Sequence, residues 1–154
     1  MADDLRFRPA AEDDIPAILA LLTDDPLGAL REGGPPEVYR EAFRAMAASP
    51  ALHLLVGEAG GEIIATYQLA ILPGLSERGR TRALLEAVRV AAPHRSRGIG
   101  ERLLRDAMAR ATAAGAGVME LFTHRRRTRA HAFYDRLGFT PSHIGYKRDL
   151  TDGA

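Results

Sequence analysis

Residues 88–100, with the sequence VRVAAPHRSRGIG, contain the pattern on which the predicted fold depends. The stretch opens with branched apolar residues that are typical of a strand, and Pro93 ends that strand. Gly98 and Gly100 then lead into a segment whose apolar residues recur at helical spacing. The sequence therefore predicts a strand, a short glycine-containing turn and a helix in direct succession.

This turn is suited to bind an anion, because a helix N-terminus presents N–H groups without intrahelical partners and a partial positive charge. Gly98 and Gly100 let a phosphate approach the backbone closely, and Arg95 and Arg97 add positive charge and donors. Two other phosphate motifs are excluded: the P-loop lysine is missing, and Leu103 stands where the dinucleotide fingerprint needs glycine. From these local features alone, a glycine turn with solvated arginines remains the alternative.

Periodicity and turn residues predict the elements around this turn. Residues 58–62 separate two apolar runs and indicate a β-hairpin, and residues 73–81 form a polar loop. In chain order we expect strand 5–8, helix 12–22, a helix between Pro36 and Pro50, strands 52–56, 63–71 and 82–91, helix 100–115, strand 118–122, helix 128–137 and strand 144–150. This order predicts an α/β fold with a mixed sheet, in one domain that spans residues 1–154.

Composition narrows the functional classes. The 154 residues include no cysteine, which excludes disulfides, thiolate metal sites and a cysteine nucleophile, and we expect no metal. The net charge of +1 argues against a nucleic-acid partner, although the arginine run at 125–129 keeps nucleic-acid binding as an alternative. The start of the chain does not resemble a signal peptide, and no apolar run approaches the roughly 20 residues of a membrane span. A cytoplasmic protein without membrane partners is expected.

Residues 88–100, followed by Leu103 and Leu104, resemble the cofactor motif of the GNAT N-acetyltransferase superfamily. Residues 130–139, AHAFYDRLGF, look like the second signature of that superfamily, and residues 5–14 are similar to its usual start. The resemblance covers nearly the whole chain. It implies a mostly antiparallel central sheet with one splayed strand pair and flanking helices, and acetyl-CoA as the cofactor.

The resemblance also assigns the cofactor contacts. Backbone groups of the strand around Val88 would bind pantetheine as an added strand does, and amides from Ser96 to Glu101 would hold the pyrophosphate. The expected cofactor-binding residues are Val88, Arg89, Val90, Arg95, Ser96, Arg97, Gly98, Ile99, Gly100, Glu101 and Arg127. Arg127 occupies a position where many relatives have asparagine, and residues 125–127 could equally form a solvated loop.

The implied reaction is direct transfer of an acetyl group to a primary amine. Tyr134 matches the tyrosine of the family and is expected to protonate the leaving thiolate, because a phenol has a pKa near 10 and a thiol a pKa near 8.5. Two carboxylates are candidates for the base. Glu86 shares the side-chain parity of Val88 and Val90, and Glu120 lies in an apolar run that would raise its pKa. Either one could instead be a structural acid.

The acceptor amine is not specified by the sequence. In relatives, the segments matching residues 27–39 and 72–82 shape the acceptor pocket. A catalytically inactive module that senses acyl-CoA is the main rival function, and the resemblance leaves a homodimer open.

Overall fold

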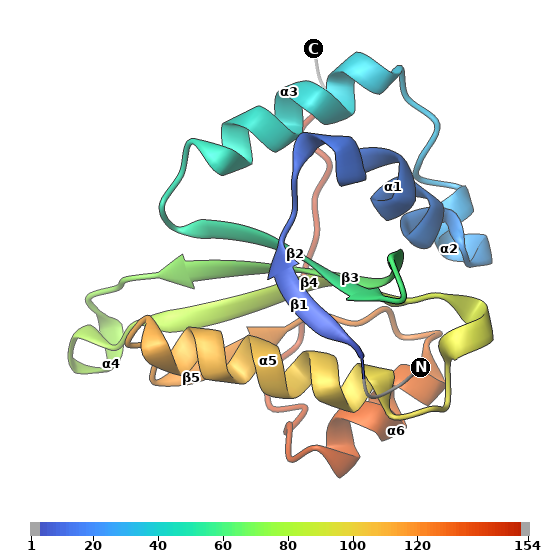
Figure 1. Ribbon diagram of the computed structural model, residues 1–154. Helices are drawn as coiled ribbons and strands as arrows, with labels where there is room; N and C mark the ends of the chain where they lie inside the picture. Colours follow the sequence, from blue (N-terminus) through green and yellow to red (C-terminus); the bar gives the residue numbers. More distant parts are fainter. Residues whose placement is uncertain (1–3, 152–154) are drawn as a thin grey trace. The chain divides into compact units, whose positions relative to one another are not determined.

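A glycine pair, Gly60 and Gly61, closes the hairpin from which the sheet is built. Both residues have positive φ, +59° and +80°, as a tight hairpin turn that matches strand twist requires. The sheet has the order β1-β2-β3-β4-β5, in which only β4 and β5 run parallel. Its strands are β1 (Arg6–Pro9), β2 (Leu52–Ala59), β3 (Glu62–Leu72), β4 (Arg82–Val90) and β5 (Val118–Leu121) (Figure 1). This mixed sheet confirms the fold class expected from the sequence.

The computed structural model describes residues 4–151, which form two compact units divided between Leu121 and Phe122. The first unit carries the sheet, and the second carries α6 (Thr128–Arg136). A single domain over residues 1–154 includes residues outside the described range and stays a prediction. Within the described part of the chain, no helix combines the length and apolarity that crossing a bilayer requires.

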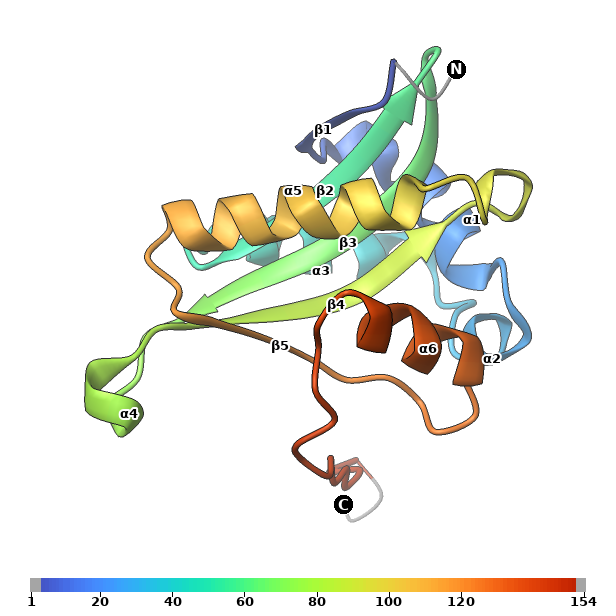
Figure 2. The ribbon, with the colours of Figure 1, turned by 90° about the horizontal axis from the view of Figure 1, so that it is seen from below.

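Helices cover both faces of the sheet in the first unit (Figures 1 and 2). One face packs on α5 (Ile99–Ala113), and the Tyr67 hydroxyl of β3 donates a hydrogen bond to Asp106 of this helix. The opposite face carries the helices that precede the hairpin. These are η1 (Glu12–Asp14), α1 (Ile15–Thr23), α2 (Pro26–Ala29) and α3 (Pro36–Ala47). Leu55, Ile64, Leu69, Leu85, Leu103 and Leu104 are at most 2% exposed and form the core between these layers.

A β-bulge interrupts β4. Glu86 pairs with Gln68 and Arg89 pairs with Thr66, so two residues of β4 lie opposite the single residue Tyr67. The first of these, Ala87, has φ of +50°, an uncommon value for a residue other than glycine.

The extra residue changes which side chains share a face, because strand side chains alternate. Glu86 and Arg89 pair with residues on the face opposite Tyr67, the one that carries α1. Val90 pairs with Ala65, which lies on the same face as Tyr67. The expectation that Glu86 shares the parity of Val88 and Val90 is therefore wrong, because it assumed uninterrupted alternation.

The two parallel strands separate where β4 approaches the turn. Their pairing ends at Leu85 and Leu121, whereas β4 continues to Val90. The short helix η2 (Ala92–His94) then leads into the turn before α5. This arrangement confirms the splayed strand pair.

Besides η2, two short helices lie outside the predicted elements. Asp25 caps α2 by accepting a hydrogen bond from the Gly28 amide at 2.7 Å, and Pro26 starts that helix. The predicted loop 73–81 contains α4 (Ser76–Gly79), a single turn in which the last three residues have positive φ.

The predicted last strand, 144–150, is absent from the second unit. Ile144, Tyr146 and Leu150 are 81–91% exposed, and residues 140–149 carry no regular secondary structure. Alternating apolar residues become a strand only where a neighbouring strand supplies hydrogen-bond partners and a face to bury. No described strand pairs with this segment.

Candidate functional site: the turn before α5

The turn before α5 presents backbone N–H groups to an external acceptor. Ser96 and Gly98 are both left-handed, with φ of +61° and +76°, and Gly98 is the N-cap of α5. The first helical hydrogen bond runs from the Arg102 amide to the Gly98 carbonyl at 3.1 Å. The amides of Ile99 to Glu101 precede it, and no side chain within the described residues caps the helix.

The turn is open on the side of Gly98. A Cβ placed on Gly98 would meet no atom of the described residues within 4 Å, apart from its chain neighbours, so a ligand can approach the backbone from that side. Converging amides with an open approach are the arrangement in which proteins hold phosphate groups. The amides from Ser96 to Glu101 could therefore hold a phosphate group.

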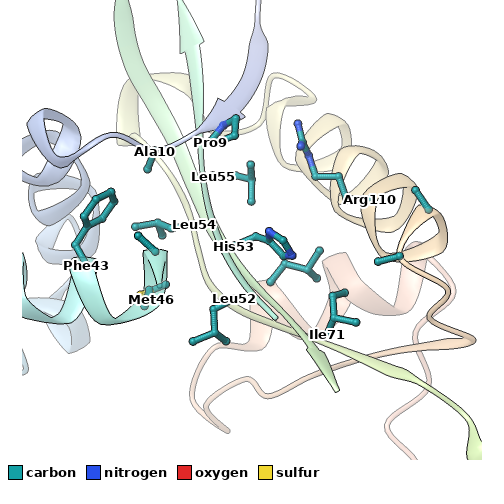
Figure 3. Close-up of a pocket in the computed structure, with 14 residues that line it drawn as sticks. Pro9, Ala10, Phe43, Met46, Leu52, His53, Leu54, Leu55, Ile71 and Arg110 are labelled. Atoms are coloured by element: carbon teal, nitrogen blue, oxygen red, sulfur yellow. The ribbon is translucent and has the colours of Figure 1, made fainter. Parts of the chain in front are cut away.

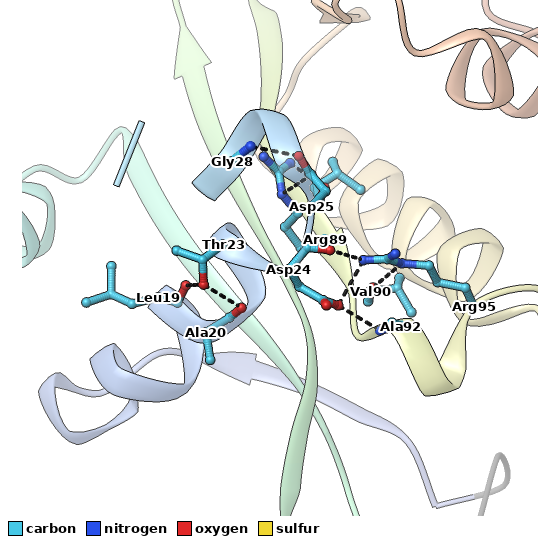
Figure 4. A network of polar contacts seen from close by, with 11 residues as sticks. Leu19, Ala20, Thr23, Asp24, Asp25, Gly28, Arg89, Val90, Ala92 and Arg95 are labelled. Atoms are coloured by element: carbon cyan, nitrogen blue, oxygen red, sulfur yellow. Dashed lines mark hydrogen bonds and ion pairs between the residues drawn. The ribbon is translucent and has the colours of Figure 1, made fainter. Parts of the chain in front are cut away.

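The two arginines of the turn have different surroundings. Arg95 donates from Nη2 to Asp24 Oδ2 at 2.9 Å and from Nε to the Val90 carbonyl at 2.9 Å (Figure 4). Arg97 is exposed and makes no hydrogen bond or ion pair with a described residue. Arg97 is thus the cation of the turn that a phosphate could recruit without breaking an existing contact.

The strand residues before the turn also differ from one another. The Arg89 guanidinium donates to the Val88 carbonyl at 2.9 Å, and its Nε lies 3.7 Å from Asp25 Oδ2. The side chain of Arg89 is only 16% exposed, so this residue is directed toward the α1–α2 junction rather than toward solvent. Val90 ends β4 with its carbonyl bonded to Arg95.

The remaining predicted cofactor residues divide between the two units. Ile99 is buried, and Glu101 forms an ion pair with Arg105 at 2.5 Å, so both can serve the turn only through their amides. Arg127 is the N-cap of α6, and Tyr134 lies in the last turn of that helix, in the second unit. The Tyr134 ring contacts Phe133 and Phe139 edge-on, with centroids 5.2 Å and 5.7 Å away.

Glu86 stands on an open part of the sheet. It is exposed, and it makes no hydrogen bond or ion pair with any described residue. Gln68 faces it across the β3–β4 ladder and is half-buried within a strand stretch that is otherwise buried from Ile64 to Ala70. The sheet is therefore partly open to solvent at Glu86 and Gln68, which lie opposite each other on β4 and β3.

Glu120, the second candidate base, has a partner. Arg82 of β4 donates to its Oε2 at 3.0 Å, and both side chains are about two-fifths exposed. The sequence places Glu120 among apolar neighbours, but the parallel β4–β5 pairing supplies a guanidinium beside it.

The first unit also contains a cavity of about 460 Å³ at the part of β2 that β1 leaves uncovered. Phe43 and Met46 of α3 line one side, and Arg110 of α5 lines the other (Figure 3). Arg110 is held by Asp106 at 2.8 Å and by the Phe7 carbonyl at 3.1 Å. The lining includes no residue of β4 or of the turn, so this cavity is separate from the phosphate site.

Sequence reasoning missed Asp24 and Gln68. Asp24 contacts Arg95, which is 71 residues away, and no local pattern signals such a pairing. Gln68 is detectable only as a polar residue inside an apolar strand, and its partner position depends on the register of β4.

Comparison with known proteins assigns the family. Residues 15–139 match the model of the acetyltransferase (GNAT) family. The chain is 29% identical over 144 residues to an aminoalkylphosphonate N-acetyltransferase of Salmonella typhimurium, covering 94% of this chain and 90% of that protein. A crystal structure of a protein described as a transcriptional regulator from Bacillus halodurans is 34% identical, with a TM-score of 0.91 over 95% of this chain and 99% of the other.

A predicted acetyltransferase of Clostridium acetobutylicum, solved with acetyl-CoA, is similar in fold. Its TM-score is 0.75 at 16% identity, and the alignment covers 96% of this chain and 97% of the other.

The fold places a left-handed turn and a helix N-terminus at the end of a strand that has separated from its parallel neighbour. The chain belongs to the acetyltransferase (GNAT) family, which confirms the family expected from the sequence. Membership in this family supports acetyl-CoA as the co-substrate.

Proposed function

We propose that this protein is an N-acetyltransferase that moves the acetyl group of acetyl-CoA directly to a primary amine. The observation that carries the proposal is the left-handed turn at Ser96 and Gly98, open to ligand, at the end of a strand that has separated from its neighbour. This is the geometry that a pyrophosphate followed by an extended pantetheine arm requires.

Each part of the site has a defined task in this proposal. When bound, acetyl-CoA supplies the acetyl group as a thioester. The amides of residues 96–101 bind the pyrophosphate, and Arg97 adds positive charge. Peptide groups of β4 from Glu86 to Val90 orient the pantetheine arm, since β5 leaves this edge of the strand uncovered.

Proton movement requires one acid and one base. Glu86 accepts a proton from the amine, directly or through water, as the nitrogen bonds to the acetyl carbon. The carbon–sulfur bond breaks, and Tyr134 donates its hydroxyl proton to the departing thiolate. The products are an N-acetylated amine and free coenzyme A. Gln68, opposite Glu86, offers an amide that can hold the amine or the water in line.

The acceptor is tested by thiol release from acetyl-CoA with a panel of amines. The panel starts with aminomethylphosphonate and 2-aminoethylphosphonate, because a relative with 29% identity is named for such substrates. Methylamine and ethylamine are the matched amines without the phosphonate. We expect at least one primary amine to release thiol in proportion to N-acetylated product. A protein that neither binds coenzyme A nor releases thiol with any amine would overturn the proposal.

An inactive acyl-CoA sensor is the second candidate, and it is favoured by the relative described as a transcriptional regulator. In that case coenzyme A binds but no amine releases thiol. A homodimer, a cytoplasmic location and the lack of a nucleic-acid partner stay predictions.

Substitution of Gly98 by alanine tests the phosphate site. The φ of +76° makes any other residue costly, by about 1 kcal/mol of the free energy of unfolding. The new methyl group would also project into the open approach, and we expect the Kd for coenzyme A to rise by more than about tenfold. Isothermal titration calorimetry measures this change.

Gly115, beyond the other end of α5, provides the matched control. It has φ of +81°, and a Cβ there also meets no described atom within 4 Å, its chain neighbours aside. Gly115→Ala should lose similar stability and keep the Kd for coenzyme A. Equal Kd values for the two alanine variants would place the phosphate elsewhere.

A further inference from the structure

Asp24, the C-cap residue of α1, connects the α1–α2 junction to the phosphate turn. Its Oδ2 accepts hydrogen bonds from the Ala92 amide at 2.8 Å and from Arg95 Nη2 at 2.9 Å. The same Nη2 also donates to the Asp24 carbonyl at 3.0 Å (Figure 4). One carboxylate thus holds both the backbone before the turn and a side chain of the turn.

Arg95 continues this connection to the end of β4. While Nη2 contacts Asp24, Nε donates to the Val90 carbonyl at 2.9 Å. The guanidinium therefore joins the last residue of the strand to the helical layer above it. These contacts restrict the path of residues 91–94 between β4 and the turn. They therefore also restrict the direction of the backbone amides that follow in the turn.

The neighbouring acid strengthens the same junction. Asp25 caps α2 through the Gly28 amide at 2.7 Å, and its Oδ2 lies 3.7 Å from Arg89 Nε. Two consecutive acids of the α1–α2 junction therefore face two arginines of the β4–turn segment. This charge pattern ties helices from the first part of the chain to the strand end and turn that bind the ligand.

The pair of Asp24 and Arg95 contributes more to geometry than to stability. Their side chains are 34% and 41% exposed, and ion pairs this open to water contribute little to the free energy of unfolding. A turn that is already restrained, in contrast, loses less conformational entropy when the ligand binds, so the free energy of binding is more favourable. The effect should therefore appear in binding.

We propose that Asp24 is a positioning residue for coenzyme A: it holds Ala92 and Arg95 so that the turn is ordered before the pyrophosphate arrives. Arg95 then acts through the turn and not as a direct ligand of the phosphate. This inference rests on the proposed function, since it assumes that the turn binds coenzyme A.

The Kd for coenzyme A in three variants distinguishes this role from direct phosphate binding by Arg95. We expect Asp24→Asn and Arg95→Gln each to raise the Kd about tenfold, and the double variant to be no worse than either, because both remove one shared connection. If Arg95 instead bound the phosphate directly, Asp24→Asn would release it from a competing carboxylate and would leave the Kd unchanged or lower. That result would overturn the inference.

Steady-state kinetics add a readout that general destabilisation would not produce. Asp24→Asn should raise the KM for acetyl-CoA about tenfold and leave kcat within about threefold, with an unchanged melting temperature for the free protein. Equal losses in kcat and in melting temperature would contradict a positioning role.

The control variant is Glu12→Gln, which breaks an exposed ion pair of similar length, 2.7 Å to Arg44, between η1 and α3. It should leave the Kd for coenzyme A unchanged. If the wild-type protein fails to bind coenzyme A, the proposed function fails; if it binds and Asp24→Asn binds equally well, only this inference fails.

Discussion

Substitution of Tyr134 by phenylalanine is expected to lower kcat about 100-fold while the Kd for coenzyme A stays within about twofold, since loss of a general acid commonly reduces turnover by two or more orders of magnitude. The ring contacts to Phe133 and Phe139, at 5.2 Å and 5.7 Å, need no hydroxyl and are retained in the variant. The change therefore removes the proposed proton donor and preserves these ring contacts. Thiol release at saturating acetyl-CoA measures the effect.

Tyr146 is the matched control, because it lies in the same unit and is 91% exposed. Tyr146→Phe should leave kcat unchanged. Normal turnover in Tyr134→Phe would exclude Tyr134 as the acid.

Substitution of Glu86 by glutamine is expected to lower kcat/KM for the amine about 100-fold, the size of effect that loss of a general base produces. The matched variant is Glu120→Gln, which should stay within about threefold. The reason for the difference is local: Arg82 binds the Glu120 carboxylate at 3.0 Å, whereas Glu86 is exposed opposite Gln68.

Separate kinetic constants distinguish a base from a residue that binds acetyl-CoA. Glu86→Gln should lose kcat/KM for the amine and keep the KM for acetyl-CoA within about threefold. If Glu120→Gln shows the large loss and Glu86→Gln does not, the two roles are exchanged.

Much of the fold was predictable because its signals are local. The glycine turn at 60–61, the proline at 93 and the helical periodicity after Gly98 each fix a chain direction within a few residues. The strand–turn–helix succession that orders the amides of the turn follows from these signals. The motif resemblance indicates the family from the sequence alone.

The features that escaped prediction depend on long-range contacts. The bulge at Ala87 has no glycine to announce it, and its register is set by pairing with β3. The last strand was predicted from the alternation of Ile144 and Tyr146, yet a strand forms only with a partner. The ion pair of Arg95 with Asp24 joins residues 71 positions apart and changes the interpretation of an arginine that the motif alone assigns to the phosphate.

The bulge in β4 changes which side chains point to which face of the sheet. Before the bulge, Leu85 points to the face that packs on α5. After the bulge, the alternation is reversed, and Arg89 points to the opposite face, on the side of Asp25. In an unbroken strand, this guanidinium would point to the face that packs on α5, where an unpaired charge is very costly. The single extra residue at Ala87 thus lets a largely buried arginine pair with Asp25 at the end of a strand whose earlier residues pack in the apolar core.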